Sequence, residues 1–251
     1  MHLLGIDTST ARVSVALGCD GELMGEISLA GGQRHAEQLA PAVRYLCDEV
    51  GVELRQLAAV AVGVGPGLFT GLRVGVTSAK VMAQALRIPA VCVPSLDLVA
   101  YPLRHTQRLI AAVLDARRRE VFYALYRPVP GGVQRVSDYE VNAPDDLVGE
   151  LEARGDEVLL AGEGALMYRD RFASLERAEL AGPGSAFPRA AALLDLATSR
   201  FQREEFCVPS EVRPMYLRQS DAEIEWEREH YEPTPDNEPD DAGEAGTGAV
   251  A

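Results

Sequence analysis

Residues able to bind an anion or a metal ion gather in two short segments, each of which follows an apolar run. The first segment is Asp7-Thr8-Ser9-Thr10, directly after residues 3–6. A turn with small hydroxyl side chains can wrap phosphate oxygens, and an aspartate at a strand end can hold hydrated Mg²⁺. The alternative is a polar turn whose side chains bond their own backbone. The tetrapeptide alone favours this alternative.

The second segment contains Gly65, Pro66 and Gly67, between an apolar run at residues 58–64 and an expected helix that reaches residue 86. Backbone N–H groups at such a helix start can bind an anion, and Gly65 and Gly67 permit close approach of a ligand. Thr70 is a candidate N-cap. The segment lacks both the Gly-Lys-Ser/Thr of a P-loop and the spacing of Gly-x-Gly-x-x-Gly. Together the two segments predict a phosphate site that is vestigial or shared with a partner.

The helix after this segment combines a smooth face with an apolar stripe. Small residues recur every fourth position, beside larger apolar ones, and the set comprises Gly71, Leu72, Gly75, Val76, Ala79 and Ala83. Small residues let another helix approach closely, although glycine costs a helix about 1 kcal/mol relative to alanine. A stripe of this kind usually packs internally, but this one is wide for a single buried face. On the residues alone, internal packing and a partner interface are equal alternatives.

Other patterns that would carry catalysis are missing. The four histidines form no His-x-x-x-His pair, and no Gly-x-Ser-x-Gly motif occurs. The cysteines at positions 19, 47, 92 and 207 are far apart in sequence, which favours small buried thiols in a reducing cytoplasm over a zinc knuckle or a redox pair. Arg117, Arg118 and Arg119 form a turn that is expected to be solvated. The residues therefore predict no catalytic group and no metal ligand.

The charge of the chain is concentrated at its end. The net charge is −14, and residues 221–251 alone contribute 11 acidic residues and one basic residue. This segment is too polar to fold by itself, so we expect it to be largely disordered. The weakly acidic remainder argues against extensive direct contact with nucleic acid. No apolar run approaches the ~20 residues of a membrane span, and the N-terminus does not resemble a signal peptide, so we expect a cytoplasmic protein without membrane contact.

The order of apolar segments predicts two α/β domains. In the first, residues 1–104, we expect strands at 3–7, 13–17, 23–29, 58–64 and 88–93, with helices at 35–50, after the glycine segment and from 96. In the second, residues 105–220, we expect strands at 109–114, 121–126 and 158–161, with helices at 144–153 and 187–203. The polar turn that starts at Asp115 echoes the one at Asp7. This echo suggests a duplicated unit, and the last helix is expected to pack back on the first domain.

Four segments together give a family resemblance. They are Gly5-Ile6-Asp7-Thr8-Ser9-Thr10, His35-Ala36-Glu37-Gln38-Leu39, the run from Gly63 to Gly75, and Pro214-Met215-Tyr216-Leu217-Arg218. They resemble the TsaB (YeaZ-like) family, specifically over residues 1–100 and more loosely to about 220. The resemblance implies an actin-like α/β fold (sugar kinase/Hsp70-like, ribonuclease H-like), with two related subdomains that each have a central mixed sheet. It also implies a role in adding the threonylcarbamoyl group to N6 of adenosine 37 in tRNAs that read ANN codons.

The catalytic relative in this family, TsaD, carries a His-x-x-x-His pair where this chain has Ser95 and Val99. Neither residue replaces an imidazole as a metal ligand. The resemblance therefore implies a non-catalytic paralogue that forms a heterodimer with TsaD and recruits the ATPase TsaE. The resemblance also implies that ATP or ADP with Mg²⁺ binds at or near the TsaD interface and that tRNA contacts this chain only indirectly. It favours the small-residue face of the helix as that interface. Whether the isolated chain forms a homodimer stays an open question.

A second reading is a free-standing actin-fold enzyme, either a small-molecule kinase or a glycoprotease-like peptidase. Asp7 and the glycine segment motivate this reading. A peptidase would need a nucleophile or a metal centre, and the sequence offers neither. We therefore rank the scaffold subunit first.

Overall fold

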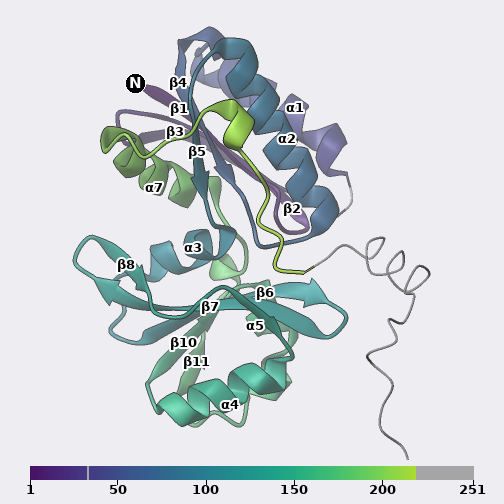
Figure 1. Cartoon of the computed structure of the whole chain (residues 1–251), viewed down its shortest axis with the longest axis vertical. Coiled ribbons are helices and arrows are strands. Elements are labelled where there is room, and N and C mark those ends of the chain that lie inside the picture. Colours follow the sequence, from purple (N-terminus) through teal and green to yellow (C-terminus); the bar gives the residue numbers. More distant parts are fainter. Residues whose placement is uncertain (33, 219–251) are drawn as a thin grey trace, which may run out of the picture. The chain divides into compact units, whose positions relative to one another are not determined.

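Two β-sheets, one from each half of the chain, organise the fold (Figure 1). The computed structural model describes residues 1–32 and 34–218. In the first sheet the strands lie in the order β3-β2-β1-β4-β5. Their bounds are β1 (His2–Asp7), β2 (Arg12–Cys19), β3 (Glu22–Ala30), β4 (Leu57–Gly63) and β5 (Ala90–Val93).

The second sheet has the order β11-β10-β6-β7-β8, with β9 paired to β7. Its strands are β6 (Leu109–Arg117), β7 (Glu120–Val129), β8 (Gly132–Arg135), β9 (Glu140–Asn142), β10 (Val158–Ala161) and β11 (Ala178–Leu180). The helices of the first half are α1 (His35–Val50), α2 (Phe69–Leu86) and α3 (Ser95–Ala100). Those of the second half are α4 (Pro144–Arg154), α5 (Glu163–Met167), α6 (Arg169–Phe172) and α7 (Ala190–Gln202). Short 3₁₀ turns are η1 (Leu54–Gln56), η2 (Tyr101–Leu103), η3 (Pro183–Ser185) and η4 (Pro209–Glu211).

The two sheets repeat one pattern of strand pairing. Strand β1 pairs antiparallel with β2 and parallel with β4, and β6 pairs antiparallel with β7 and parallel with β10. In each half a further strand adds antiparallel to the hairpin and another adds parallel at the opposite edge. The predicted duplication and the actin-like α/β class are therefore confirmed.

Alternating side chains divide each sheet between two hydrophobic cores. In the first sheet, Leu4 and Ile6 face α1 and α2, whereas Leu3 faces α7, which supplies Leu193 and Leu194. In the second sheet, one face packs on α4 and α5 and the other on α3. Helix α7 thus covers one face of the first sheet, although it follows the second sheet in sequence. Figure 1 shows α7 beside β1–β5.

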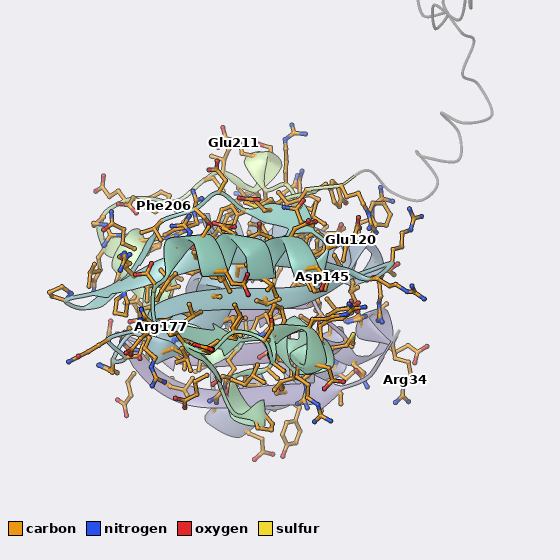
Figure 2. All side chains as sticks on the ribbon, turned by 90° about the horizontal axis from the view of Figure 1, so that it is seen from below. Arg34, Glu120, Asp145, Arg177, Phe206 and Glu211 are labelled. Carbon is orange, nitrogen blue, oxygen red and sulfur yellow. The ribbon has the colours of Figure 1, made fainter. Side chains whose placement is uncertain are left out.

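The proposed boundary at residues 104–105 falls between η2 and β6. The described part of the chain nevertheless forms one compact unit, which extends from Met1 to Arg218. The expected tail at residues 221–251 lies outside the described residues. Exposed charges such as Arg34 and Glu211 project from the edge of the ribbon in Figure 2.

Several expected boundaries shift for local reasons. Strand β5 begins at Ala90 rather than 88, because Arg87 adopts the left-handed conformation (φ 57°) and Ile88 N–H still bonds the Ala83 carbonyl of α2. Helix α7 begins at Ala190 rather than 187, because Pro188 holds the preceding residue out of the helical region. Leu68, not Thr70, occupies the N-cap of α2, so the expected threonine cap is wrong.

A C-terminal strap, defined here as residues 204–218, crosses the first half. Its Cys207 exchanges two backbone hydrogen bonds with Ala90 of β5, at 2.9 and 3.0 Å. Further along, Lys80 Nζ donates to the Ser210 carbonyl at 3.2 Å, and Met215 N–H donates to the Val64 carbonyl at 2.7 Å. The strap therefore ties β5, α2 and the glycine segment together.

Candidate functional site

The two predicted phosphate-binding segments lie against each other. Strands β1 and β4 are parallel neighbours, so the turns after their carboxyl ends meet. Leu68 N–H donates to the Ser9 carbonyl at 2.7 Å. Thr8 Oγ1 donates to the Gly71 carbonyl, also at 2.7 Å. The chain thus closes the hydroxyl turn onto the start of α2.

Asp7 is the centre of a buried hydrogen-bond network. Its Oδ1 accepts from Ser9 N–H at 3.1 Å and from Ser9 Oγ at 2.8 Å, and its Oδ2 accepts from Ser95 Oγ at 3.0 Å. Ser95 Oγ in turn accepts from Gly65 N–H at 3.1 Å. Burial raises the pKa of Asp7, and the hydrogen bonds from Ser9 oppose that rise. The carboxyl group therefore joins β1, the glycine segment and α3.

This geometry does not fit a triphosphate with its Mg²⁺. The whole turn is inside the protein, with Asp7, Thr8, Ser9 and Thr10 at most 2% exposed. A Cβ added to Gly67 would lie 2.2 Å from the Ser9 carbonyl oxygen, so the two segments are already in contact. Both carboxylate oxygens of Asp7 are engaged within the chain. The residues of the predicted phosphate site, Asp7 to Thr10 with Gly65, Pro66 and Gly67, thus form a self-bonded polar turn in this structure, and a phosphate at this site stays a prediction.

The small-residue face of α2 points into the protein. Gly71, Leu72, Gly75, Val76, Ala79 and Ala83 are all buried. A Cβ on Gly71 would lie 2.2 Å from the Thr8 carbonyl oxygen, and one on Gly75 would lie 2.2 Å from Thr8 Oγ1. All six residues are thus packed inside their own chain, and their predicted contact with a partner stays a prediction. Their small size lets α2 lie directly on the hydroxyl turn of its own chain.

Ser95 and Val99, the positions where the family resemblance implies the paired imidazoles of TsaD, have structural roles here. Ser95 is fully buried and relays the hydrogen bond from Gly65 to Asp7. Val99, at 2% exposure, belongs to the core under the second sheet. Within residues 1–32 and 34–218, no three or more His, Cys, Asp or Glu side chains are grouped to hold a metal ion.

His35 contributes to the same network in a way that the sequence did not indicate. It starts α1, is 4% exposed, and its Nε2 lies 2.7 Å from the Thr10 carbonyl oxygen. Because a carbonyl only accepts, Nε2 carries the hydrogen. Its spacing of four from buried Leu39 was the signal that could have placed it on the inner helix face.

The second half repeats the aspartate turn with a different chemistry. Asp115 is 4% exposed, accepts from Arg117 N–H at 3.0 Å and pairs with the Arg117 guanidinium at 3.2 Å. Arg117, Arg118 and Arg119 all have positive φ, between 53° and 64°. Burial, helped by the nearby charge of Asp115, raises the pKa of Glu163 to about 7. Sequence reasoning missed Glu163, because a single glutamate beside Gly162 carries no motif.

Glu163→Gln is expected to stabilise the protein at pH 8 by roughly 1 kcal/mol after allowance for solvent screening. The folded-state pKa of Glu163 lies above the ordinary value of 4.5, so its contribution to stability is complete below pH 4.5 and is lost as the pH rises to about 7. Urea denaturation at pH 4.5 and pH 8 measures this difference. The two proteins should have the same free energy of unfolding at the lower pH. A difference that is equal at both pH values would contradict the raised pKa of Glu163. Exposed Glu152→Gln is the control and should leave stability nearly unchanged at both pH values.

The two related sheets define an actin-like protein. The buried hydrogen bond between Asp7 and Ser95 closes the polar turn after β1 in this protein. A sequence profile of the family described as "TsaD: tRNA N6-adenosine threonylcarbamoyltransferase" matches residues 29–226. The chain therefore belongs to this family, within its TsaB (YeaZ-like) branch.

Three relatives support the placement in that branch. The TsaB proteins of Bacillus subtilis and Escherichia coli are each 28% identical to this chain, over 90% and 91% of it and 98% of their own length. A solved structure from Pseudomonas aeruginosa, described as similar to peptidase YeaZ, superposes with a TM-score of 0.76. It is 32% identical and covers 86% of this chain and 99% of its own.

Proposed function

We propose that this chain acts in tRNA threonylcarbamoyladenosine biosynthesis, in the cytoplasm, as the non-catalytic partner of a TsaD-like subunit. That subunit would transfer the threonylcarbamoyl group to N6 of adenosine 37 in tRNAs that read ANN codons. The observation that carries the proposal is similarity along nearly the whole chain to proteins named for this biosynthesis. The family resemblance, which implies imidazoles in TsaD where this chain has Ser95 and Val99, supports the non-catalytic role, because Ser95 is hydrogen-bonded to Asp7 and Val99 is in a hydrophobic core.

The relatives' names favour this reading over a free-standing kinase or peptidase. The buried network around Asp7 also argues against a kinase, because the carboxylate that would hold hydrated Mg²⁺ already accepts three hydrogen bonds from Ser9 and Ser95. Any ATP or ADP would then be held mainly by residues of the partner, near the shared interface. A TsaE-like ATPase joins the assembled pair, and tRNA contacts this chain only through the complex.

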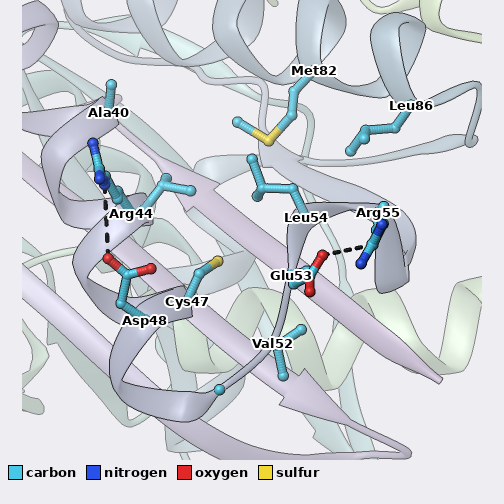
Figure 3. A pocket seen from close by; sticks show the side chains of 12 residues that line it. Ala40, Arg44, Cys47, Asp48, Val52, Glu53, Leu54, Arg55, Met82 and Leu86 are labelled. Carbon is cyan, nitrogen blue, oxygen red and sulfur yellow. Dashed lines mark ion pairs between the residues drawn. The ribbon is translucent and has the colours of Figure 1, made fainter.

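The partner surface that we propose is the outward side of α1 and α2. A groove of about 820 Å³ lies between the end of α1, η1 and the last turns of α2 (Figure 3). Its floor is apolar and includes Val43, Met82 and Leu86. The Arg44–Asp48 and Glu53–Arg55 ion pairs line its sides at 3.7 and 2.6 Å, as Figure 3 shows. An apolar centre with a charged rim is the usual anatomy of a protein interface.

A large exposed apolar side chain lines this groove. Leu54 of η1 is 39% exposed. An exposed apolar residue in an apolar groove is typical of an interaction site. A helix of the TsaD-like partner laid into the groove would cover Leu54.

Leu54→Glu tests this surface with the full-length chain. It should weaken binding to the purified TsaD-like subunit at least tenfold in isothermal titration, because a carboxylate would be buried without a partner. It should also lower threonylcarbamoyladenosine formation in a reconstituted reaction. Leu180→Glu is the matched control, since Leu180 is 37% exposed on β11 of the second sheet.

The outcomes separate the parts of the proposal. Unchanged binding by Leu54→Glu would mean that the groove is not the interface. Failure of the unaltered chain to bind the TsaD-like subunit would overturn the proposed function itself. Sedimentation of the isolated chain, with and without the substitution, tests whether the same groove serves a homodimer.

A further inference from the structure

Two cysteines that are far apart in sequence lie side by side in the fold. Cys92 is on β5 and Cys207 is on the C-terminal strap, with 3.7 Å between their sulfur atoms. Both are partly buried, and both are free thiols. The two backbone hydrogen bonds between Ala90 and Cys207 fix the strap beside β5. The contact therefore rests on backbone pairing as well as on side-chain packing.

We propose that Cys92 and Cys207 form an oxidisable dithiol that a low-molecular-weight disulfide converts into an intrachain disulfide. The thiolate of Cys207 attacks one sulfur of the small disulfide, forms a mixed disulfide and releases one small thiol. The thiolate of Cys92 then attacks the Cys207 sulfur, forms the intrachain bond and releases the second small thiol. Two protein thiols are thus oxidised and one small disulfide is reduced to two thiols.

The surroundings assign the order of attack. Cys207 lies on the strap and is itself partly exposed, so a small disulfide can reach it from outside. Cys92 lies on β5, and its backbone carbonyl accepts a hydrogen bond from Arg200 Nη1 at 2.6 Å. Burial, together with the neighbouring Cys207, raises the pKa of the Cys92 thiol to about 12, and the charge of Arg200 offsets this rise only in part. Cys92 is thus the resolving thiol, and the second step accelerates as the pH rises.

The disulfide would convert the strap from a detachable to a fixed segment. In the reduced protein the strap is attached by hydrogen bonds such as Lys80–Ser210 and Met215–Val64, with Cys207 packed against Cys92. A covalent bond between residues 92 and 207 restricts the unfolded chain and prevents the strap from leaving β5. In a reducing compartment such a bond is transient, which is the behaviour of a redox-sensitive site.

The test uses the full-length protein incubated with oxidised glutathione, followed by thiol blocking and mass spectrometry. We expect loss of two hydrogen atoms from the intact mass, a cross-linked peptide pair containing Cys92 and Cys207, and reversal by dithiothreitol. The oxidised protein should also melt about 5 °C higher than the reduced protein. Cys92→Ser and Cys207→Ser should each abolish the cross-link, whereas Cys19→Ser and Cys47→Ser should retain it.

Three results would overturn the proposal. They are a stable glutathione adduct on Cys207 without a cross-link, a cross-link that involves Cys19 or Cys47 instead, and no reaction under conditions that oxidise the urea-unfolded chain. Because the test needs neither tRNA nor a TsaD-like subunit, its outcome is independent of the proposed function.

Discussion

Replacing Gly71 by alanine is expected to lower the free energy of unfolding by about 3 kcal/mol. An added Cβ would lie 2.2 Å from the carbonyl oxygen of Thr8 and 3.3 Å from His35 Nε2. The carbonyl cannot retreat cheaply, because it belongs to the backbone that leaves β1. Alanine also interferes with the hydrogen bond from Thr8 Oγ1 to the Gly71 carbonyl.

Whether Gly71→Ala lowers or raises the free energy of unfolding shows whether the helix position is crowded or open. At an open helix position, exchanging glycine for alanine stabilises by up to about 1 kcal/mol. Thr77→Ala on the exposed side of the same helix is the control and should be neutral or slightly stabilising. Urea denaturation of both variants measures the difference. A stabilised Gly71→Ala protein would show that α2 does not lie on the hydroxyl turn.

Asp7→Ala is expected to cost about 3 kcal/mol, because it leaves Ser9 N–H, Ser9 Oγ and Ser95 Oγ without their acceptor inside the protein. Denaturation by urea at pH 7 measures the loss. Asp7→Asn keeps one acceptor oxygen and should cost about 1 kcal/mol. Equal losses for the two variants would contradict the hydrogen-bond network.

The asparagine variant also isolates the titration of Asp7. Burial raises the folded-state pKa above the ordinary 3.8, so the folded protein holds this proton more tightly than the unfolded chain does. The resulting stability is complete below pH 3.8 and falls as the pH rises through the folded-state pKa. Asparagine cannot titrate. The free energy of unfolding of the unaltered protein should therefore exceed that of Asp7→Asn most in acid, and the difference between the two should narrow as the pH rises. A gap that widened with pH would contradict the direction of the shift.

Elements with complete local signals could be predicted from the sequence. Helix α1 begins at His35 and ends before Gly51, as expected, because an apolar stripe is followed by a glycine in the left-handed conformation (φ 75°). Strand β10 matches its predicted range, residues 158–161, because a short apolar run is bounded by polar residues and glycine. The paired polar turns at Asp7 and Asp115 correctly indicated two related sheets.

The candidate site could be predicted only in part, because its outcome depends on distant contacts. A stripe of glycine and alanine has the same sequence pattern whether it packs against its own chain or against a partner chain. Thr8, 63 residues before Gly71, decides this case by occupying the space beside α2. Whether a hydroxyl turn stays open for phosphate depends likewise on Gly67 and Ser95, which reach Asp7 and Ser9 only after β1, β4 and α3 have assembled.

The return of α7 to the first sheet has a consequence for synthesis on the ribosome. Leu3, Ala59 and Val91 sit on a sheet face whose cover, Leu193 and Leu194, is translated about a hundred residues after β5. Until α7 emerges, that apolar face lacks the cover that Leu193 and Leu194 provide. The first sheet therefore completes folding late, and a nascent chain that stalls before Ala190 exposes a surface that invites chaperone binding or aggregation.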